Sequence, residues 1–194
     1  MSARRRRCSS RWSWSERLNL RLQVAVQTGN LAQTASELGD DDAAAKLHLR
    51  ALATADSVDA PRWQSTLRSS FAQWLTANGR TDEARLLGEE ALKLAQAAHD
   101  AEAVSRATIE IARAQITTDA QGSAAGLAPL ITTLRAQNNR RLLADALSVF
   151  SNLYAVLGKG DEARKLWEEA RKLYTALEHP AKSLEPAWLT QPNA

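Results

Sequence analysis

The chain repeats one pattern of apolar and polar positions at a spacing of about 40 residues. When Gly39, Gly79, Asp119 and Gly158 are aligned as equivalent turn positions, they lie 40, 40 and 39 residues apart. A large apolar residue stands eight positions before each turn, and a small residue follows it: Leu31-Ala32, Phe71-Ala72, Ile111-Ala112 and Phe150-Ser151. Self-similarity at a fixed period of this length predicts a repeat architecture.

The positions that follow each turn predict a second helix in every unit. An alanine stands five positions after each turn and a leucine eight positions after it: Ala44, Ala84, Ala124 and Ala163, then Leu47, Leu87, Leu127 and Leu166. This spacing is typical of a helix with one apolar stripe. A single helix pair cannot bury its own stripe, so several pairs must stack. The predicted fold class is therefore all-α, an α-solenoid of about four antiparallel helix-turn-helix repeats.

The turns contain residues that favour helix ends. Gly39, Gly79 and Gly158 suit the left-handed conformation that ends many helices. The third unit is less regular, because Asp119 replaces the glycine and Pro129 falls inside the expected second helix. Proline in a helix interior costs about 3 kcal/mol or more. We therefore expect this helix to begin late, near Leu127, or to be kinked.

The repeats divide the chain into three parts. Residues 18–177 form the predicted repeat domain, with units at about 20–59, 60–99, 100–139 and 140–177. Residues 1–17 are rich in Arg and Ser and have no clear apolar stripe, which predicts a disordered tail. Residues 178–194 contain three prolines and are expected to form a cap or tail, with Trp188 covering the open end of the last repeat.

Composition and charge reduce the range of functions that the sequence supports. Hydrophobic residues make up 44% of the chain and aromatic residues 5%, a balance that favours helices here. Residues 1–22 contain seven arginines and one acidic residue, which leaves 18 basic against 21 acidic residues in the rest of the chain. The body is therefore not predicted to bind nucleic acid. The tail could tether the protein to nucleic acid or an anionic membrane, with Trp12 and Trp14 as stacking or interfacial groups.

The sequence contains no convincing catalytic or metal-binding motif. Residues 158–163 match the dinucleotide pattern Gly-x-Gly-x-x-Ala, but they follow a helical segment where that motif needs a strand. His48, His99 and His179 have no His or Cys at metal-ligand spacing, and we interpret them as surface or interface residues. Cys8 cannot form an internal disulfide, and no apolar run reaches the length of a membrane span. We expect no enzyme activity, cofactor or metal, and a cytoplasmic location.

Taken together, these residues resemble the tetratricopeptide repeat family, in the long form of about 40 residues found in many bacterial multi-repeat proteins. The resemblance covers about residues 20–177 and is clearest in two units: Phe71-Ala72, Leu75, Gly79, Ala84 and Ala91, then Phe150-Ser151, Tyr154, Gly158, Ala163 and Ala170. It implies a right-handed superhelix whose first helices line a concave groove. In the family, this groove holds peptides or helices of partner proteins.

The resemblance also implies where the groove residues lie. Carried across by position, the groove-facing residues that we single out for partner binding are Gln33, Gln73, Arg106, Arg113 and Asn152. Amides and guanidiniums suit an extended peptide, because they can pair with backbone groups and attract a carboxylate.

The sequence thus predicts a non-catalytic protein–protein interaction module. The alternative is a sensory or regulatory domain of a larger signalling ATPase or transcription regulator, which binds a small ligand or an inhibitory protein. Self-association through exposed repeat ends is a further option.

Overall fold

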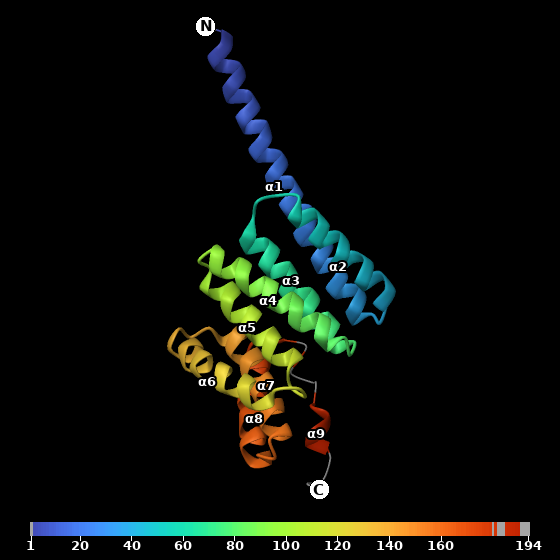
Figure 1. Ribbon diagram of the computed structural model, residues 1–194, viewed down its shortest axis with the longest axis vertical. Helices are drawn as coiled ribbons and strands as arrows, with labels where there is room; N and C mark the ends of the chain where they lie inside the picture. The colour runs from blue at the N-terminus through green and yellow to red at the C-terminus, as the bar shows by residue number, and fades with distance from the viewer. Residues whose placement is uncertain (1, 180, 182–184, 191–194) are drawn as a thin grey trace.

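The chain folds into an all-α stack of helix pairs. The structure is a computed structural model that describes residues 2–179, 181 and 185–190, with side-chain environments from residue 16 on (Figure 1). The helices of the described residues are α1 (Ser2–Glu37), α2 (Asp41–Asp56), α3 (Pro61–Ala77), α4 (Thr81–Ala97), α5 (Ala101–Ala114), α6 (Ala120–Ala136), α7 (Arg140–Val156), α8 (Gly160–Ala176) and the short α9 (Ala187–Thr190). Helix pairs follow one another along the stack, which confirms the predicted all-α solenoid.

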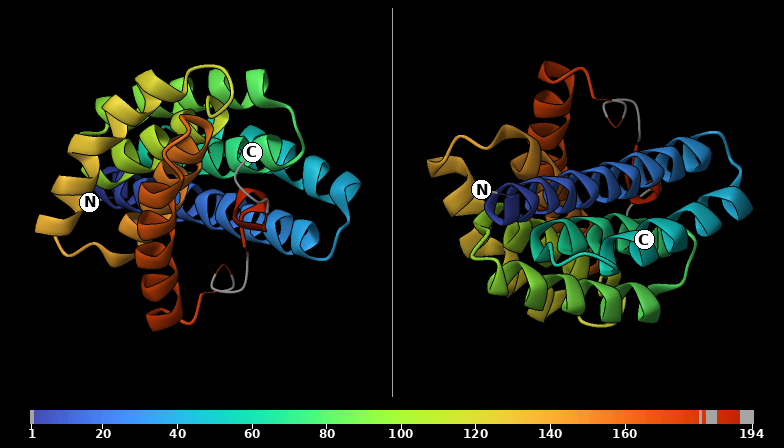
Figure 2. Two further views of the ribbon diagram at one scale, coloured as in Figure 1. Left: turned by 90° about the horizontal axis from the view of Figure 1, so that it is seen from below. Right: turned by 90° about the horizontal axis from the view of Figure 1, so that it is seen from above.

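The first helices of successive pairs form a continuous layer. α1 contacts α3, α3 contacts α5, and α5 contacts α7, while each second helix packs against its neighbours in the chain. Figure 2 looks along the stack from its two ends. The third pair is looser, because α6 packs more extensively against α7 than against α5. The layer of first helices is the scaffold that positions the candidate site.

Small residues allow the helices to pack closely. Ala32, Ala72, Ala84 and Ala163 have no exposed surface, and Ser151 is equally buried. The large residues fill the spaces between them in three clusters along the stack, the largest of which lies around α7. Short side chains at the contacts let ridges of one helix settle into grooves of the next. The pattern of small and large residues in the sequence therefore determines how the helices pack.

The glycine turns adopt the predicted conformation. Gly39, Gly79 and Gly158 have φ values of 78°, 76° and 74°, in the left-handed region that glycine enters without strain. The third turn is built differently. Asp119 is the N-cap residue there, and its carboxylate accepts a hydrogen bond from the backbone N–H of Gly122 at 2.9 Å, so it caps α6. An N-cap replaces the glycine at this turn.

The prediction that the sixth helix begins near Leu127 is wrong. α6 already begins at Ala120, and Pro129 lies in its interior. Proline lacks an N–H, so the carbonyl of Ala125 loses its intrahelical partner. Both Ala125 and Pro129 are exposed, so water can hydrate that carbonyl. The Asp119 cap and the packing of the opposite face of α6 hold the helix together across the proline.

The N-terminal segment continues α1 toward the start of the chain. Residues 2–17, expected as a disordered tail, form the first turns of α1, which projects well beyond the end of α2 (Figure 1). No glycine or proline occurs before Gly29, and arginine is a good helix former, so nothing in the sequence stops the helix. Residues 16–21 are all exposed, so this part of α1 stands outside the core.

Candidate functional groove

An open groove runs across the layer of first helices. Its volume is about 270 Å³, and its walls come from α1, α3, α5 and α7. The groove is lined mainly by polar side chains: Asn30, Gln33, Thr66, Ser69, Ser70, Gln73, Arg106, Glu110, Arg141 and Asp145, with Val26, Trp63, Leu67, Ile109 and Leu142 among the apolar ones. Residues from four repeats therefore face one shared space.

The floor of the groove is made by small residues. A Cβ atom at Gly29 would lie 2.6 Å from Cδ2 of Leu67, so glycine lets α1 approach α3 here. Ser69 is 1% exposed, and its hydroxyl has no hydrogen-bond partner within the described part of the chain. A buried hydroxyl without a partner is unfavourable, so a bound molecule that supplies one would gain from it.

Three of the five predicted binding residues line this groove. Gln33 on α1 and Gln73 on α3 are exposed, and the Gln33 amide makes one long hydrogen bond to Glu37 at 3.4 Å. Arg106 on α5 is 30% exposed and pairs with Glu102 one turn away at 3.2 Å. Exposed pairs of this kind contribute only about 0.3 to 0.5 kcal/mol, so Arg106 can exchange this partner for a ligand.

Arg113 belongs instead to a buried polar cluster between α5, α7 and α8. Its guanidinium lies 2.9 Å from the carboxylate of Glu110, and the Tyr174 hydroxyl donates a hydrogen bond to Asp145 at 2.8 Å. Burial raises the pKa of the Glu110 carboxyl above its usual range, although Arg113 opposes this effect. Burial and the Asp145 carboxylate likewise raise the pKa of Tyr174. Arg113 therefore serves the junction between two repeats and does not line the groove.

Asn152 is engaged by the C-terminal segment of the chain. The indole N–H of Trp188, in α9, donates a hydrogen bond to the Asn152 side-chain oxygen at 2.7 Å. Ala181, Trp188 and Leu189 also pack against the core cluster around α7. Trp188 was expected to cover the open end of the last repeat. It lies against α7, so the predicted binding residue Asn152 already has a partner within the chain.

Several groove residues were not predicted from the sequence, among them Trp63, Arg141 and His179. Trp63 lies near the start of α3 and is 38% exposed. Arg141 lies in the first turn of α7, and His179 follows the end of α8. The predicted groove positions lie no more than thirteen residues before each turn. Trp63 and Arg141 lie sixteen and seventeen residues before their turns, so a longer repeat alignment could have found them.

The described residues contain no cluster of three or more His, Cys, Asp or Glu side chains that could hold a metal ion. Among the same residues, no helix is long and apolar enough to cross a membrane. His48 lies between α2 and α3, where its ring stacks on Phe71 with centroids 4.9 Å apart. It is an interface residue, as one of the two sequence interpretations held.

Comparison with known proteins agrees with the repeat pattern. A family model described as tetratricopeptide repeat matches residues 65–113 and 143–178, which include α3 to α5 and α7 to α8. The crystal structure of BtubC (BKLC) from P. vanneervenii is similar at a TM-score of 0.41 and 17% identity, over 100% of this chain and 97% of that one. No curated protein matches the chain. The two matched stretches, the glycine turns and the stacked helix pairs confirm the predicted tetratricopeptide repeats, which the family model identifies at residues 65–113 and 143–178.

Proposed function

We propose that this protein is a non-catalytic interaction module that binds an extended peptide segment of a partner protein in the groove of α1, α3, α5 and α7. Tetratricopeptide repeats generally mediate protein–protein interaction, and solenoids offer extended concave surfaces for this purpose. The observation that carries the proposal is the row of side-chain amides and hydroxyls on neighbouring helices, which includes Gln33, Ser69 and Gln73. Such groups can pair with the N–H and C=O groups of an extended backbone.

The charges of the groove favour an acidic group on the peptide. Arg106 and Arg141 both line the groove and carry accessible surface. Of the two acidic residues that line it, Glu110 is paired with Arg113, and Asp145 accepts the Tyr174 hydroxyl. The arginines can therefore meet a carboxylate of the partner with charge-assisted hydrogen bonds.

A small-ligand sensor fits the groove less well. Pockets for drug-sized ligands have volumes of roughly 300 to 1,000 Å³ and mostly apolar walls. This groove, at about 270 Å³, lies at the lower limit of that range, and most of the residues that line it are polar. A peptide makes more use of such a surface, because its backbone offers donors and acceptors along its whole length.

The proposal is tested by selecting peptides from a displayed random library on the whole protein. Binding of the selected peptides is then measured by fluorescence polarisation for the wild type, Arg106→Glu and Arg85→Glu. Arg85 is a matched control, because it is 35% exposed and pairs with an acidic residue one turn away, but it lies on α4. We expect Arg106→Glu to weaken binding at least tenfold and Arg85→Glu to leave it unchanged. Selection of no peptide, or equal loss in both variants, would overturn the proposal.

A further inference from the structure

Large apolar residues are exposed along one face of the C-terminal half of α1 and in the turn that follows it. Leu20, Val24, Leu31 and Leu38 are 61%, 42%, 58% and 80% exposed. Leu20, Val24 and Leu31 lie on one side of α1, because they are four and seven residues apart, and Leu38 directly follows the last helical residue. The stripe is ~27 Å long, from the rise of 1.5 Å per residue. Exposed apolar residues aligned on one helix face and flanked by polar residues form a candidate interaction site.

The equivalent residues in other repeats indicate that such a stripe is normally covered by a neighbouring element. Leu31 is equivalent to Phe71 and Phe150 in the second and fourth units, which are only 7% and 9% exposed. Phe71 is covered by the preceding helix pair, where it stacks on His48 of α2. Over Leu31, no element of the described chain occupies the corresponding place. The right-hand view of Figure 2 looks onto this end of the stack, where α1 lies uncovered.

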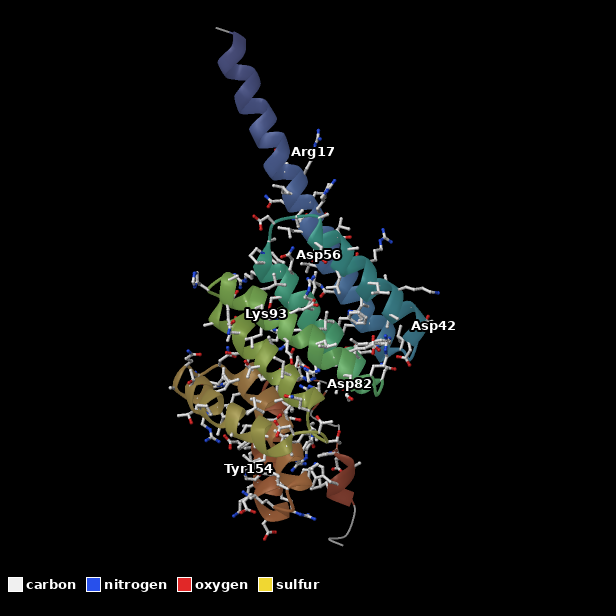
Figure 3. All side chains as sticks on the ribbon, in the orientation of Figure 1. Arg17, Asp42, Asp56, Asp82, Lys93 and Tyr154 are labelled. Atoms are coloured by element: carbon white, nitrogen blue, oxygen red, sulfur yellow. The ribbon has the colours of Figure 1, made fainter. Side chains whose placement is uncertain are left out.

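Opposite charges stand at the two ends of the stripe. Arg17 and Arg21 lie at its start and are exposed, within a segment of seven arginines. Glu37 and residues 40–42 (Asp-Asp-Asp) lie at its end and are exposed as well. Figure 3 shows Arg17 and Asp42 at opposite ends of the pair formed by α1 and α2. The surface is therefore apolar in its centre, basic at one end and acidic at the other.

We propose that a second copy of this chain covers the stripe, with the two α1 helices packed antiparallel. Centring the contact near residue 29 places Leu20 of each copy opposite Leu38 of the other. The basic end around Arg17 then lies beside the acidic end around Asp42 of the second copy, twice, by two-fold symmetry. A parallel arrangement would place like charges together and repel.

Among the described residues, those at the opposite end of the stack form a poorer partner surface for an apolar stripe. The exposed side of α8 carries charged residues, among them Arg164, Glu168 and Arg171. An apolar stripe gains little from contact with such a surface, because its charged groups would lose water without a partner. Head-to-tail stacking of copies is therefore disfavoured, and the two like ends meet instead.

The oligomeric state of the full chain tests this interface. Sedimentation equilibrium of the wild type should show a reversible monomer–dimer equilibrium. Leu31→Glu should raise the dimer dissociation constant at least tenfold. The matched control is Leu49→Glu, because Leu49 is also 58% exposed but lies on α2, outside the stripe. Circular dichroism confirms that both variants keep their helices.

The orientation is tested by exchanging charges. Asp42→Lys should weaken the dimer several-fold, and the double variant Arg17→Glu/Asp42→Lys should restore it, since each new charge then faces its opposite. A wild type that stays monomeric at all concentrations would overturn the proposal. So would open-ended assembly, or equal effects of Leu31→Glu and Leu49→Glu. A dimer strengthened by Asp42→Lys would exclude the antiparallel arrangement.

Discussion

The burial of His48 predicts that this protein loses stability in mild acid. His48 is 3% exposed, and its imidazole packs against the rings of Phe71 and Trp74, with centroids 4.9 Å and 6.0 Å away. Desolvation lowers the pKa of His48 from 6.5 to about 4, so the ring is neutral in the folded protein at neutral pH. Protonation therefore favours the unfolded chain, in which the imidazole is hydrated.

The size of this stability loss follows from the pKa values of His48 in the folded and the unfolded chain. Because the folded pKa is the lower one, the unfolded chain binds the proton first as the pH falls below about 6.5. The stabilisation is complete above that pH, declines between about pH 6.5 and about pH 4, and changes no further below. Between about pH 7.5 and about pH 4.5, the free energy of unfolding should fall by roughly 2.5 kcal/mol from this residue alone.

Urea unfolding across this pH range measures the effect in the wild type and in His48→Phe. Phenylalanine can keep the stacked ring but does not titrate. When the stability curves of the wild type and the variant are subtracted, the contributions of carboxylates elsewhere therefore cancel. The free energy of unfolding of His48→Phe relative to that of the wild type should rise by roughly 2.5 kcal/mol as the pH falls from about 7.5 to about 4.5. His99→Asn is the control, because His99 is exposed, and asparagine tolerates its left-handed backbone. A difference that stays constant over the range would refute the reasoning.

Three further substitutions test other parts of the structure. Pro129→Ala should raise the free energy of unfolding by about 1 to 3 kcal/mol, because it restores a helix hydrogen bond; Thr132→Ala on the same exposed face should change it far less. Arg68→Met should cost about 1 kcal/mol at low salt and less at high salt, since it removes ion pairs to acidic residues of α2 and α4. Trp188→Phe should cost about 1 kcal/mol in urea unfolding, because the donor to Asn152 is lost; an unchanged midpoint would show that this bond does not stabilise the protein.

The repeat architecture was predictable because its signals are local. The turn glycines take a backbone conformation that few other residues tolerate, and the alanine positions are fixed by close helix contacts. The side of the helix on which Gln33, Gln73 and Arg106 lie follows from the same register, and the structure places all three along one groove. Periodicity therefore predicts which side of a helix a residue occupies.

Periodicity does not predict how deeply a residue is buried or what reaches it from elsewhere. Arg113 lies six residues before its turn, as Gln73 does, but it forms an ion pair with Glu110 inside a junction between repeats. Asn152 meets Trp188, which is 36 residues away in sequence, and no local pattern indicates that contact. Pro129 lies in a helix whose other bonds outweigh one missing donor. Each of these features depends on tertiary contacts that a single repeat does not encode.

The number of first helices along the groove sets the length of the segment that it can recognise. Four packed helices at about 8 to 10 Å between neighbours span roughly 24 to 30 Å between the outer axes. An extended chain advances about 3.3 Å per residue, so roughly seven to nine residues cross from α1 to α7. At the far end, the segment bearing Trp188 already occupies Asn152. Selected sequences should therefore share a short core motif, and residues added beyond it should contribute little to affinity.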